Sequence, residues 1–285
     1  MPEGDTILRA ARALNRALAG RVVTRFDSAY PAVTRVAEDH PIVGRTVESV
    51  SARGKHLLMV FSGNLVLRTH MRMNGSWHLY RTGAPWQRPA HEMRVLVATA
   101  DVVAIGFNVP VAELLSTQQI ERQKEIRGLG PDLLAGAGEQ YEYNVDTVEI
   151  VRRMRAQERE AIADVLLNQR VAAGIGNVFK SEILFEARIE PFTQVGSLND
   201  ADLERIVGIA RDQLAAAALD PKKTLTRSVG RRTTRSLDPS ARLWVYGRSG
   251  KPCRRCGSLI RSRKTGVDAR LTYWCPQCQS TATSP

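Results

Sequence analysis

Long apolar runs are absent from this sequence, and their absence excludes one class of protein. No stretch approaches the roughly 18 apolar residues that a membrane-spanning helix needs, and the best candidates, residues 57–61 and 102–107, have the length of a strand. Glu3 and Asp5 precede every apolar stretch, so no secretory signal is visible and we expect a cytoplasmic, intracellular protein. Hydrophobic residues at 43% and charged residues at 25% are ordinary globular values, which exclude wholesale disorder.

An excess of acidic residues is also absent. The chain holds 41 Lys+Arg against 29 Asp+Glu, a formal net charge of +12, and most of the basic excess lies in residues 222–270. Such a surplus can serve solubility alone, but it also suits a polyanionic partner. Because residues 222–270 contain no amphipathic helix with a clean basic face, we expect that partner to be nucleic acid rather than a membrane.

Hydrophobic periodicity divides the 285 residues into a β-rich part and a helical part, and the length allows two domains. Residues 5–19 place apolar side chains at helical spacing, with Asp5 or Thr6 as the cap. Short strands follow over residues 46–80 and 93–107, and their spacing favours a β-sandwich or barrel. The remaining segments are predicted, in order, as a linker at 133–143, helices at 146–155, 158–169, 177–187 and 199–219, a basic polar loop at 221–241 and a compact module at 242–279.

Cysteine is scarce, and all four cysteines lie in that last module. Their pattern is Cys253-x2-Cys256-x18-Cys275-x2-Cys278. Two CxxC turns supply four thiolates, the ligand set of a zinc ribbon built from two hairpins. Disulfides would need an oxidising compartment, which nothing else in the sequence supports. Four protein ligands leave no open coordination position, so we expect one structural zinc ion.

The segment Gly174-Ile175-Gly176-Asn177 joins two predicted helices. Glycine allows a close backbone approach, and Asn177 occupies the expected N-cap of the second helix. Backbone amides at a helix N-terminus bind phosphate, so the turn is a candidate phosphate site. A plain helix–helix turn is the alternative.

The chain opens Met1-Pro2-Glu3-Gly4, and removal of Met1 would expose the secondary amine of Pro2. A free α-amino group has a pKa of about 8, against about 10.4 for lysine, so roughly a tenth of it is neutral and nucleophilic at pH 7. A secondary amine forms an iminium ion with an aldehyde, and Glu3 beside it can shuttle protons. Lys55 is either a solvated charge at a strand end or a phosphate clamp.

Together these motifs resemble the formamidopyrimidine-DNA glycosylase/endonuclease VIII family over essentially the whole chain. The resemblance rests on MPEG at the start, ARGKHLL at 52–58, LLNQRVAAGIGNVFKSEILFEARIEP at 166–191, GRSGKPCRRCGSLI at 247–260 and ARLTYWCPQCQ at 269–279. It implies an α+β, multidomain fold. Its parts would be an N-terminal β-sandwich catalytic domain at 1–132, a helix–two-turns–helix DNA-binding domain at 145–241 and a C-terminal zinc finger at 242–285.

The resemblance also implies an activity and a set of site residues. Members are bifunctional enzymes of base excision repair that remove an oxidised base and then cleave the abasic strand, as DNA glycosylase and AP lyase. Four positions match catalytic residues of the family, namely the N-terminal nucleophile Pro2, its neighbouring acid/base Glu3, the phosphate-contacting Lys55, and Arg270 of the finger hairpin, which takes part in δ-elimination. Four match DNA contacts, namely Arg72 and Met73 in the void left by the flipped base, and Arg127 and Asn177 on phosphates.

Two departures from the purine-type members favour the endonuclease VIII branch, with oxidised pyrimidines as substrates. Residues 103–108 read VAIGFN, without the arginine and aromatic that the purine branch inserts into DNA, and the opening MPEGD differs from MPELPE. The alternatives are a purine-type glycosylase acting on 8-oxoguanine or formamidopyrimidine, or a non-catalytic protein that binds DNA damage on the same scaffold. We expect a nucleoid-associated monomer that binds damaged double-stranded DNA, one zinc ion, no membrane and no small-molecule cofactor.

Overall fold

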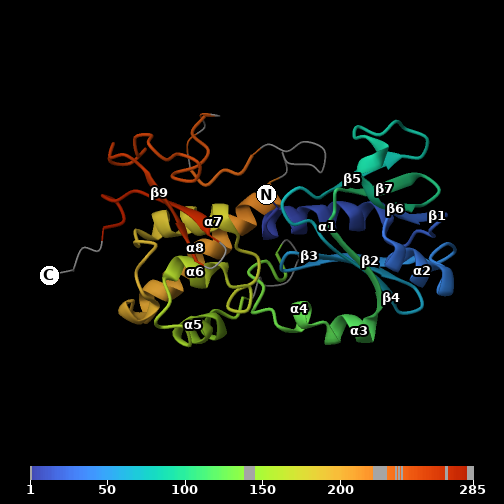
Figure 1. Cartoon of the computed structure of the whole chain (residues 1–285), viewed down its shortest axis with the longest axis horizontal. Helices are drawn as coiled ribbons and strands as arrows, with labels where there is room; N and C mark the ends of the chain where they lie inside the picture. Colours follow the sequence, from blue (N-terminus) through green and yellow to red (C-terminus); the bar gives the residue numbers. More distant parts are fainter. Residues whose placement is uncertain are drawn as a thin grey trace. The chain divides into compact units, whose positions relative to one another are not determined.

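The structure, a computed structural model, describes residues 2–137, 145–220, 230–234, 236, 238, 240–266 and 269–280. It contains two compact units (Figure 1). The N-terminal unit is formed chiefly by residues up to Gly128, and the C-terminal unit by residues 129–219 and the described residues from Gly230 onward. The sequence predicts three domains, at 1–132, 145–241 and 242–285, and these limits stay a proposal.

Two four-stranded antiparallel sheets form the framework of the N-terminal unit, with strand orders β1-β6-β7-β5 and β2-β3-β4-β8. The strands are β1 (Arg25–Ser28), β2 (Val47–Arg53), β3 (His56–Phe61), β4 (Leu65–His70), β5 (Ser76–Arg81), β6 (Met93–Ala98), β7 (Val102–Phe107) and β8 (Val111–Ser116). The helices are α1 (Gly4–Leu18), α2 (Pro31–Asp39), α3 (Thr117–Arg122) and α4 (Lys124–Arg127), with a 3-10 turn at Ala90–Glu92.

One apolar core joins the two sheets and α1. Helix α1 contributes the face that contains Leu14 and Leu18, β3 contributes Met59, β4 contributes Leu67 and β6 contributes Val95, all fully buried. Along the edge strand β2 the buried residues Val47 and Val50 are three positions apart, because the register on β3 shifts between Val47 and Ser49. This arrangement confirms the predicted β-sandwich.

The predicted strands of residues 46–80 and 93–107 are present, but two strands and three helices of the N-terminal unit were not predicted. They are the short strand β1, strand β8, helix α2, which begins at Pro31, and helices α3 and α4. The predicted cap of the first helix was wrong. Helix α1 starts at Gly4 with Glu3 at the N-cap, and no side chain caps it, so neither Asp5 nor Thr6 has that role.

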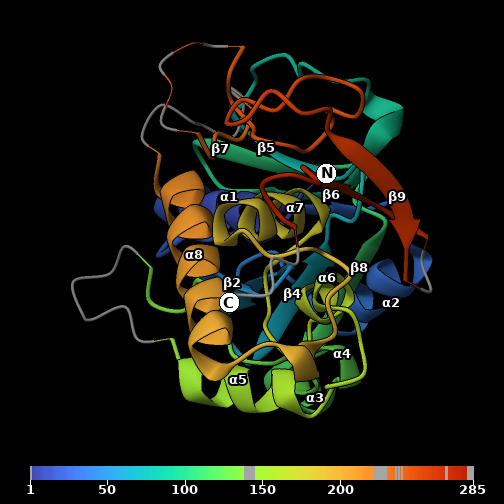
Figure 2. The same cartoon turned by 90° about the vertical axis from the view of Figure 1, so that its left-hand side faces the viewer.

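The part of the C-terminal unit that the structure describes contains four α-helices and a β-hairpin. They are α5 (Thr147–Arg155), α6 (Ile162–Leu167), α7 (Asn177–Ala187), α8 (Asp200–Leu219), a 3-10 turn at Val195–Ser197, and strands β9 (Arg261–Thr265) and β10 (Arg270–Trp274). Helix α7 packs against α6, α8 and β10, and α5 packs against α8 (Figure 2). All residues of α7 except Glu186 are buried, which is why its sequence shows no amphipathic pattern.

Several predictions for this unit need correction. Helix α6 is shorter than the predicted 158–169, because Ala161 lies in a bridge to Gln194. The predicted linker at 133–143 begins inside the packed structure, since Leu133 and Leu134 are buried, while residues 138–144 lie outside the described residues. Most of the predicted loop at 221–241 lies outside them as well. Among its described residues the zinc module has one hairpin, β9–β10, and in place of the predicted second hairpin an isolated bridge between Pro252 and Leu259.

Helix α8, at 20 residues, is the longest helix in the described part of the chain. Neither it nor any other helix among the described residues is long and apolar enough to cross a membrane.

Candidate nucleic-acid interface and catalytic residues

Pro2 and Glu3 lie at the start of α1. Pro2 is half-buried, whereas the Glu3 side chain has 0% exposure. The backbone carbonyl of Glu3 accepts from the amides of Thr6 and Ile7 at 2.9 and 3.1 Å, which makes Glu3 the boundary residue of the helix.

Helix α1 runs antiparallel to β2, and this direction places Pro2. Near the helix C-terminus the amide of Gly20 donates to the Val47 carbonyl at 2.8 Å, and one turn earlier Asn15 Oδ1 accepts from the Val50 amide at 2.7 Å. From the Gly20–Val47 contact, the helix extends about 20 Å back to its N-terminus, and β2 extends about the same distance forward to its last residue. The N-terminus of α1 therefore lies at the end of the sheet where β2 turns into β3.

Lys55 lies in that turn. Gly54 and Lys55 alone connect the paired residues Arg53 and His56, and Gly54 has φ 59°. A two-residue hairpin with a left-handed glycine at its first position is the type II′ turn, which matches the twist of the strands. The turn presents Lys55, half-buried, at the same end of the sheet as Pro2 and Glu3.

The connection between β4 and β5, residues 71–75, leaves the sheet at this end too, because the last residue of β4, His70, pairs with the first residue of β3. We call these residues the wedge loop. Met71 and Gly75 are buried, while the three residues between them are exposed, and Met73 has an exposed fraction of 57%. The wedge loop thus holds Arg72 and Met73 toward solvent on a fixed base.

In the stretch where the resemblance places the inserted side chains of the purine-type members, residues 103–107 lie in strand β7. Phe107 has 0% exposure and packs against the rings of His78 and Trp86, with centroids 5.2 and 6.0 Å away. Ile105 is equally buried. Phe107 therefore serves a small core on the sheet face and is not presented for insertion.

Two histidines that the sequence reasoning missed adjoin Lys55. The rings of His56 and His70 meet edge to face at 4.8 Å. Burial lowers the pKa of His56 to about 3, helped by His70 and by the cations of Arg68 and Arg53. Burial, with Lys55, Arg72 and Arg68, lowers the pKa of His70 to about 4. Both rings are therefore neutral at pH 7. The only sequence signal was that each histidine adjoins a motif already singled out.

Arg127 is exposed at the end of α4, and the fully buried Ile126 beside it anchors the helix on the sheet through Leu58 and Val66. Helix α4 is thereby held firmly, so Arg127 projects from a fixed base. This position suits a phosphate contact, which remains a proposal.

In the C-terminal unit, the predicted N-cap of α7 was wrong by one residue. Gly176 is the N-cap, in an extended conformation, and Asn177 is the first helical residue. Asn177 is 7% exposed, and its Oδ1 accepts no hydrogen bond within the described part of the chain. The preceding turn is fixed by Gln169, which donates to the Ile175 carbonyl at 3.0 Å and accepts from the Gly174 amide at 3.1 Å.

A run of three fully buried polar residues in α7 holds the segments around it. Lys180 Nζ donates to Thr272 Oγ1 of β10 at 2.7 Å. Ser181 Oγ accepts from the Tyr273 amide at 3.3 Å and donates to the Asn177 carbonyl at 3.3 Å. Through these bonds α7 connects the strand that begins with the exposed Arg270 to the turn that ends at Asn177.

Glu182 completes the run. Its carboxylate accepts from the backbone amides of residues 244, 245 and 246 at 2.8 to 2.9 Å, and from the hydroxyl of Thr233. Burial raises the pKa of Glu182, and these four donors oppose that shift. The segment before the first CxxC turn is thus fastened to α7.

The four cysteine sulfurs lie within 4.8 Å of one another, and none is in a disulfide. The pairs Cys253–Cys278 and Cys256–Cys275 are 3.9 and 3.4 Å apart. Four thiolates about 2.3 Å from a tetrahedral zinc ion would be about 3.8 Å apart, so the residues fit one zinc ion. Donors from Ser258 lower the pKa of Cys256 to about 6, which favours the thiolate. Such a site has no open position, so its role is structural.

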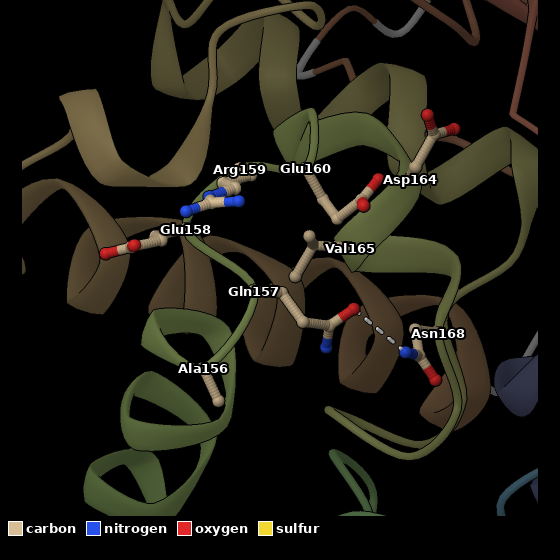
Figure 3. Close-up of a pocket in the computed structure, with 8 residues that line it drawn as sticks. All are labelled: Ala156, Gln157, Glu158, Arg159, Glu160, Asp164, Val165 and Asn168. Carbon is tan, nitrogen blue, oxygen red and sulfur yellow. Dashed lines mark hydrogen bonds between the residues drawn. The ribbon is translucent and has the colours of Figure 1, made fainter.

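A separate pocket of about 480 Å³ lies at the turn between α5 and α6 (Figure 3). It contains three carboxylates, those of Glu158, Glu160 and Asp164, against the one cation of Arg159. Burial raises the pKa of Asp164. Carboxylates repel phosphate, so this pocket does not belong to the nucleic-acid interface.

Sequence comparisons agree with this architecture. Residues 1–109 match the formamidopyrimidine-DNA glycosylase N-terminal domain, residues 137–228 its H2TH domain, and residues 250–281 the zinc finger found in FPG and IleRS. The fold and the zinc finger define a multidomain DNA-repair glycosylase scaffold.

Full-length relatives establish the family. The chain is 41% identical to the probable endonuclease 8 2 of Streptomyces coelicolor, covering 98% of this chain and 94% of that one. It is 38% identical to the DNA-(apurinic or apyrimidinic site) lyase Nei2 of Mycolicibacterium smegmatis, covering 98% and 99%. It is 32% identical to endonuclease 8 of Escherichia coli, covering 98% and 100%. The chain belongs to the formamidopyrimidine-DNA glycosylase/endonuclease 8 family.

Solved structures show the same fold. Lactococcus lactis Fpg in complex with abasic-site DNA is similar with a TM-score of 0.77 at 24% identity, covering 98% of this chain and 100% of that one. The same protein with N7-benzyl-Fapy-dG DNA gives 0.78 at 25% identity, with equal coverage.

Proposed function

We propose that this protein is a bifunctional DNA glycosylase and AP lyase of base excision repair, with Pro2 as the nucleophile. The observation that carries the proposal is the end of the sheet that gathers the N-terminus of α1, the Lys55 turn and the wedge loop. Full-length relatives named endonuclease 8 and AP lyase support it.

The chemistry begins once Met1 is removed. The neutral Pro2 nitrogen attacks C1′ of the damaged nucleotide, the bond from C1′ to the base breaks, and the base leaves with a proton. Glu3 supplies and removes protons as the sugar ring opens, leaving an iminium ion between Pro2 and C1′. The positive nitrogen acidifies the proton on C2′, because the electron pair released there is drawn toward it.

Strand cleavage follows from that acidity. Loss of the C2′ proton expels the 3′ phosphate in β-elimination, and loss of a further proton expels the 5′ phosphate in δ-elimination. Lys55 and Arg270 stabilise the negative charge that develops on the departing phosphates. Hydrolysis of the remaining iminium releases the sugar fragment and restores Pro2. The four cysteines would hold a zinc ion without an open coordination position, and so would order the hairpin that contains Arg270.

Damaged double-stranded DNA is the proposed partner, bound by a monomer in the cytoplasm at the nucleoid, without a small-molecule cofactor. Asn177 and Arg127 bind phosphates, which makes affinity depend on salt. Met73 and Arg72 fill the space left by the extruded nucleotide. A damaged base stacks and pairs less well, so its extrusion costs less.

Oxidised pyrimidines are the favoured lesions. The buried Phe107 and the absence of an arginine pair in residues 103–108 separate this chain from the purine-type pattern. The matched relatives named endonuclease 8 support the same branch. A panel of duplexes with thymine glycol, dihydrouracil, 8-oxoguanine, uracil or an abasic site tests this. Faster cleavage of 8-oxoguanine opposite cytosine than of the pyrimidine lesions would reverse the assignment.

Borohydride reduction in the presence of abasic duplex tests the enzymatic proposal. The protein is expected to form a covalent protein–DNA adduct, and Pro2→Gly, which offers only a primary amine in a more mobile chain, should weaken it strongly. A protein that only binds damaged DNA would bind the duplex and leave no adduct in either form.

A further inference from the structure

His70 is the last residue of β4 and adjoins the wedge loop. Its Nδ1 atom lies 3.1 Å from the backbone nitrogen of Arg72. Because a backbone N–H can only donate, Nδ1 is the acceptor and the ring proton is on Nε2. One imidazole nitrogen therefore holds the first amide of the exposed part of the loop.

Arg72 has a strained backbone conformation, which the hydrogen bond from its amide to His70 Nδ1 stabilises. Its φ is 45°, in the left-handed region that residues other than glycine rarely adopt. The other side of the loop is closed by the Gly75 amide, which donates to the Met71 carbonyl at 2.9 Å. A Cβ at Gly75 would lie 2.6 Å from that same oxygen, so the closure needs glycine. The direction of the exposed side chains of the wedge loop depends on these two hydrogen bonds, one to His70 and one to the Met71 carbonyl.

His70 is itself fixed by its neighbours. Its ring packs on His56, whose Nδ1 lies 3.3 Å from Nη1 of the buried Arg68. Arg68 in turn pairs with Glu113 at 2.9 Å. Burial lowers the pKa of His70 to about 4, and the charged groups that act on it, namely Lys55, Arg72 and Arg68, are all cations that lower it further in the same direction. The Nδ1 lone pair is thus available at neutral pH.

We propose that His70 is a positioning residue for lesion extrusion, acting through the Nδ1 bond to the Arg72 amide, which sets the wedge loop so that Met73 and Arg72 enter the space left by the damaged nucleotide. The proposal rests on the proposed function of this end of the sheet.

Two isosteric substitutions separate the two ring nitrogens of His70. In His70→Asn the side-chain oxygen takes the place of Nδ1 and keeps the acceptor for the Arg72 amide. In His70→Gln the terminal amide takes the place of Nε2 and the acceptor is lost. Extrusion is followed in single turnover with 2-aminopurine beside a thymine glycol, and binding of undamaged duplex is measured in parallel. We expect His70→Asn to extrude within about threefold of the wild-type rate and His70→Gln to be at least tenfold slower, with undamaged-duplex binding alike in both.

Faster extrusion by His70→Gln than by His70→Asn would overturn the proposal, because it would show that Nε2 is the nitrogen that matters. Equal extrusion rates in the two variants would overturn it as well. If the wild type processes none of the lesion duplexes, the proposed function fails instead, and the two failures are distinct. A measurement on the unmodified protein covers the case in which a variant does not fold. Nitrogen-15 NMR of the His70 ring at pH 7 should show Nδ1 unprotonated and Nε2 protonated, and a proton on Nδ1 would contradict the bond.

Discussion

At the scale of single residues, the candidate chemistry depends on backbone conformations that neighbouring residues set. Lys55 occupies the second position of a turn whose first position needs the left-handed Gly54. The motif around Lys55 and the Met1-Pro2 opening could be recognised in the sequence. The pairing of His56 with His70 could not be predicted from the sequence, because it follows from the register of β3 on β4 and not from a local sequence pattern.

Removing the charge of Lys55 should slow strand cleavage. Lys55→Met keeps the aliphatic stem and deletes the ammonium group, and the loss of one donor to a developing anion costs about 10²-fold or more in rate. Lys55→Arg keeps the positive charge and should retain most of the activity. Single-turnover cleavage of abasic duplex measures both, and wild-type cleavage by Lys55→Met would remove Lys55 from the mechanism.

The two neutral histidines predict a pH dependence of stability. Their folded pKa values of about 3 and about 4 lie below the ordinary 6.5, so between these limits the unfolded chain binds protons that the folded chain does not. The free energy of unfolding should therefore fall as pH drops from about 6.5 toward 4, by up to about 1.4 kcal/mol per pH unit for each histidine. Urea unfolding between pH 7 and 4 measures this slope. A variant with asparagine at positions 56 and 70 should show a flatter one, and an unchanged slope would assign it to other groups.

At the scale of elements, α7 organises the C-terminal unit because all of its residues except Glu186 are buried. Its limits, 177–187, could be predicted from the sequence, as could those of β3. The run Lys180-Ser181-Glu182 has no periodic signal, and its partners come from segments far along the chain. For the same reason, the attachment of the zinc module to α7 could not be predicted.

Glu182→Gln should loosen that attachment. The amide has the same shape, but it turns an NH2 group toward donors that now meet a carboxylate, which leaves a buried donor unpaired at a cost of about 2–3 kcal/mol. We expect a lower thermal midpoint and faster release of zinc to a chelator. Glu204→Gln, at an exposed position of α8, is the matched control. Equal behaviour of the two variants would mean that Glu182 does not hold the segment 244–246.

At the scale of the whole molecule, a net charge of +12 and three successive family domains belong to a protein that binds a polyanion through more than one element. The fold class could be predicted because periodicity changes from two to 3.6 along the chain and the cysteine spacing marks the last module. The strand order within the two sheets could not, since it depends on long-range pairing.

Removal of zinc should uncouple the finger from the rest of the molecule. Metal analysis should find one zinc ion per chain, and Cys275→Ser should lose it. DNA affinity should then fall at least tenfold, because the hairpin that carries Arg270 is no longer ordered, while the N-terminal unit keeps its β-sheet circular dichroism. Ser262→Ala, on the same hairpin, is the control. Full DNA binding without zinc would contradict this role of the finger.

The most direct test of the central claim is to locate the bond between protein and sugar. Reduction of the reaction with abasic duplex, followed by nuclease and protease digestion and mass spectrometry, should find the deoxyribose remnant on the peptide that begins with Pro2, attached to its ring nitrogen. A remnant on Lys55 or on any other side chain, with unmodified Pro2, would contradict the account.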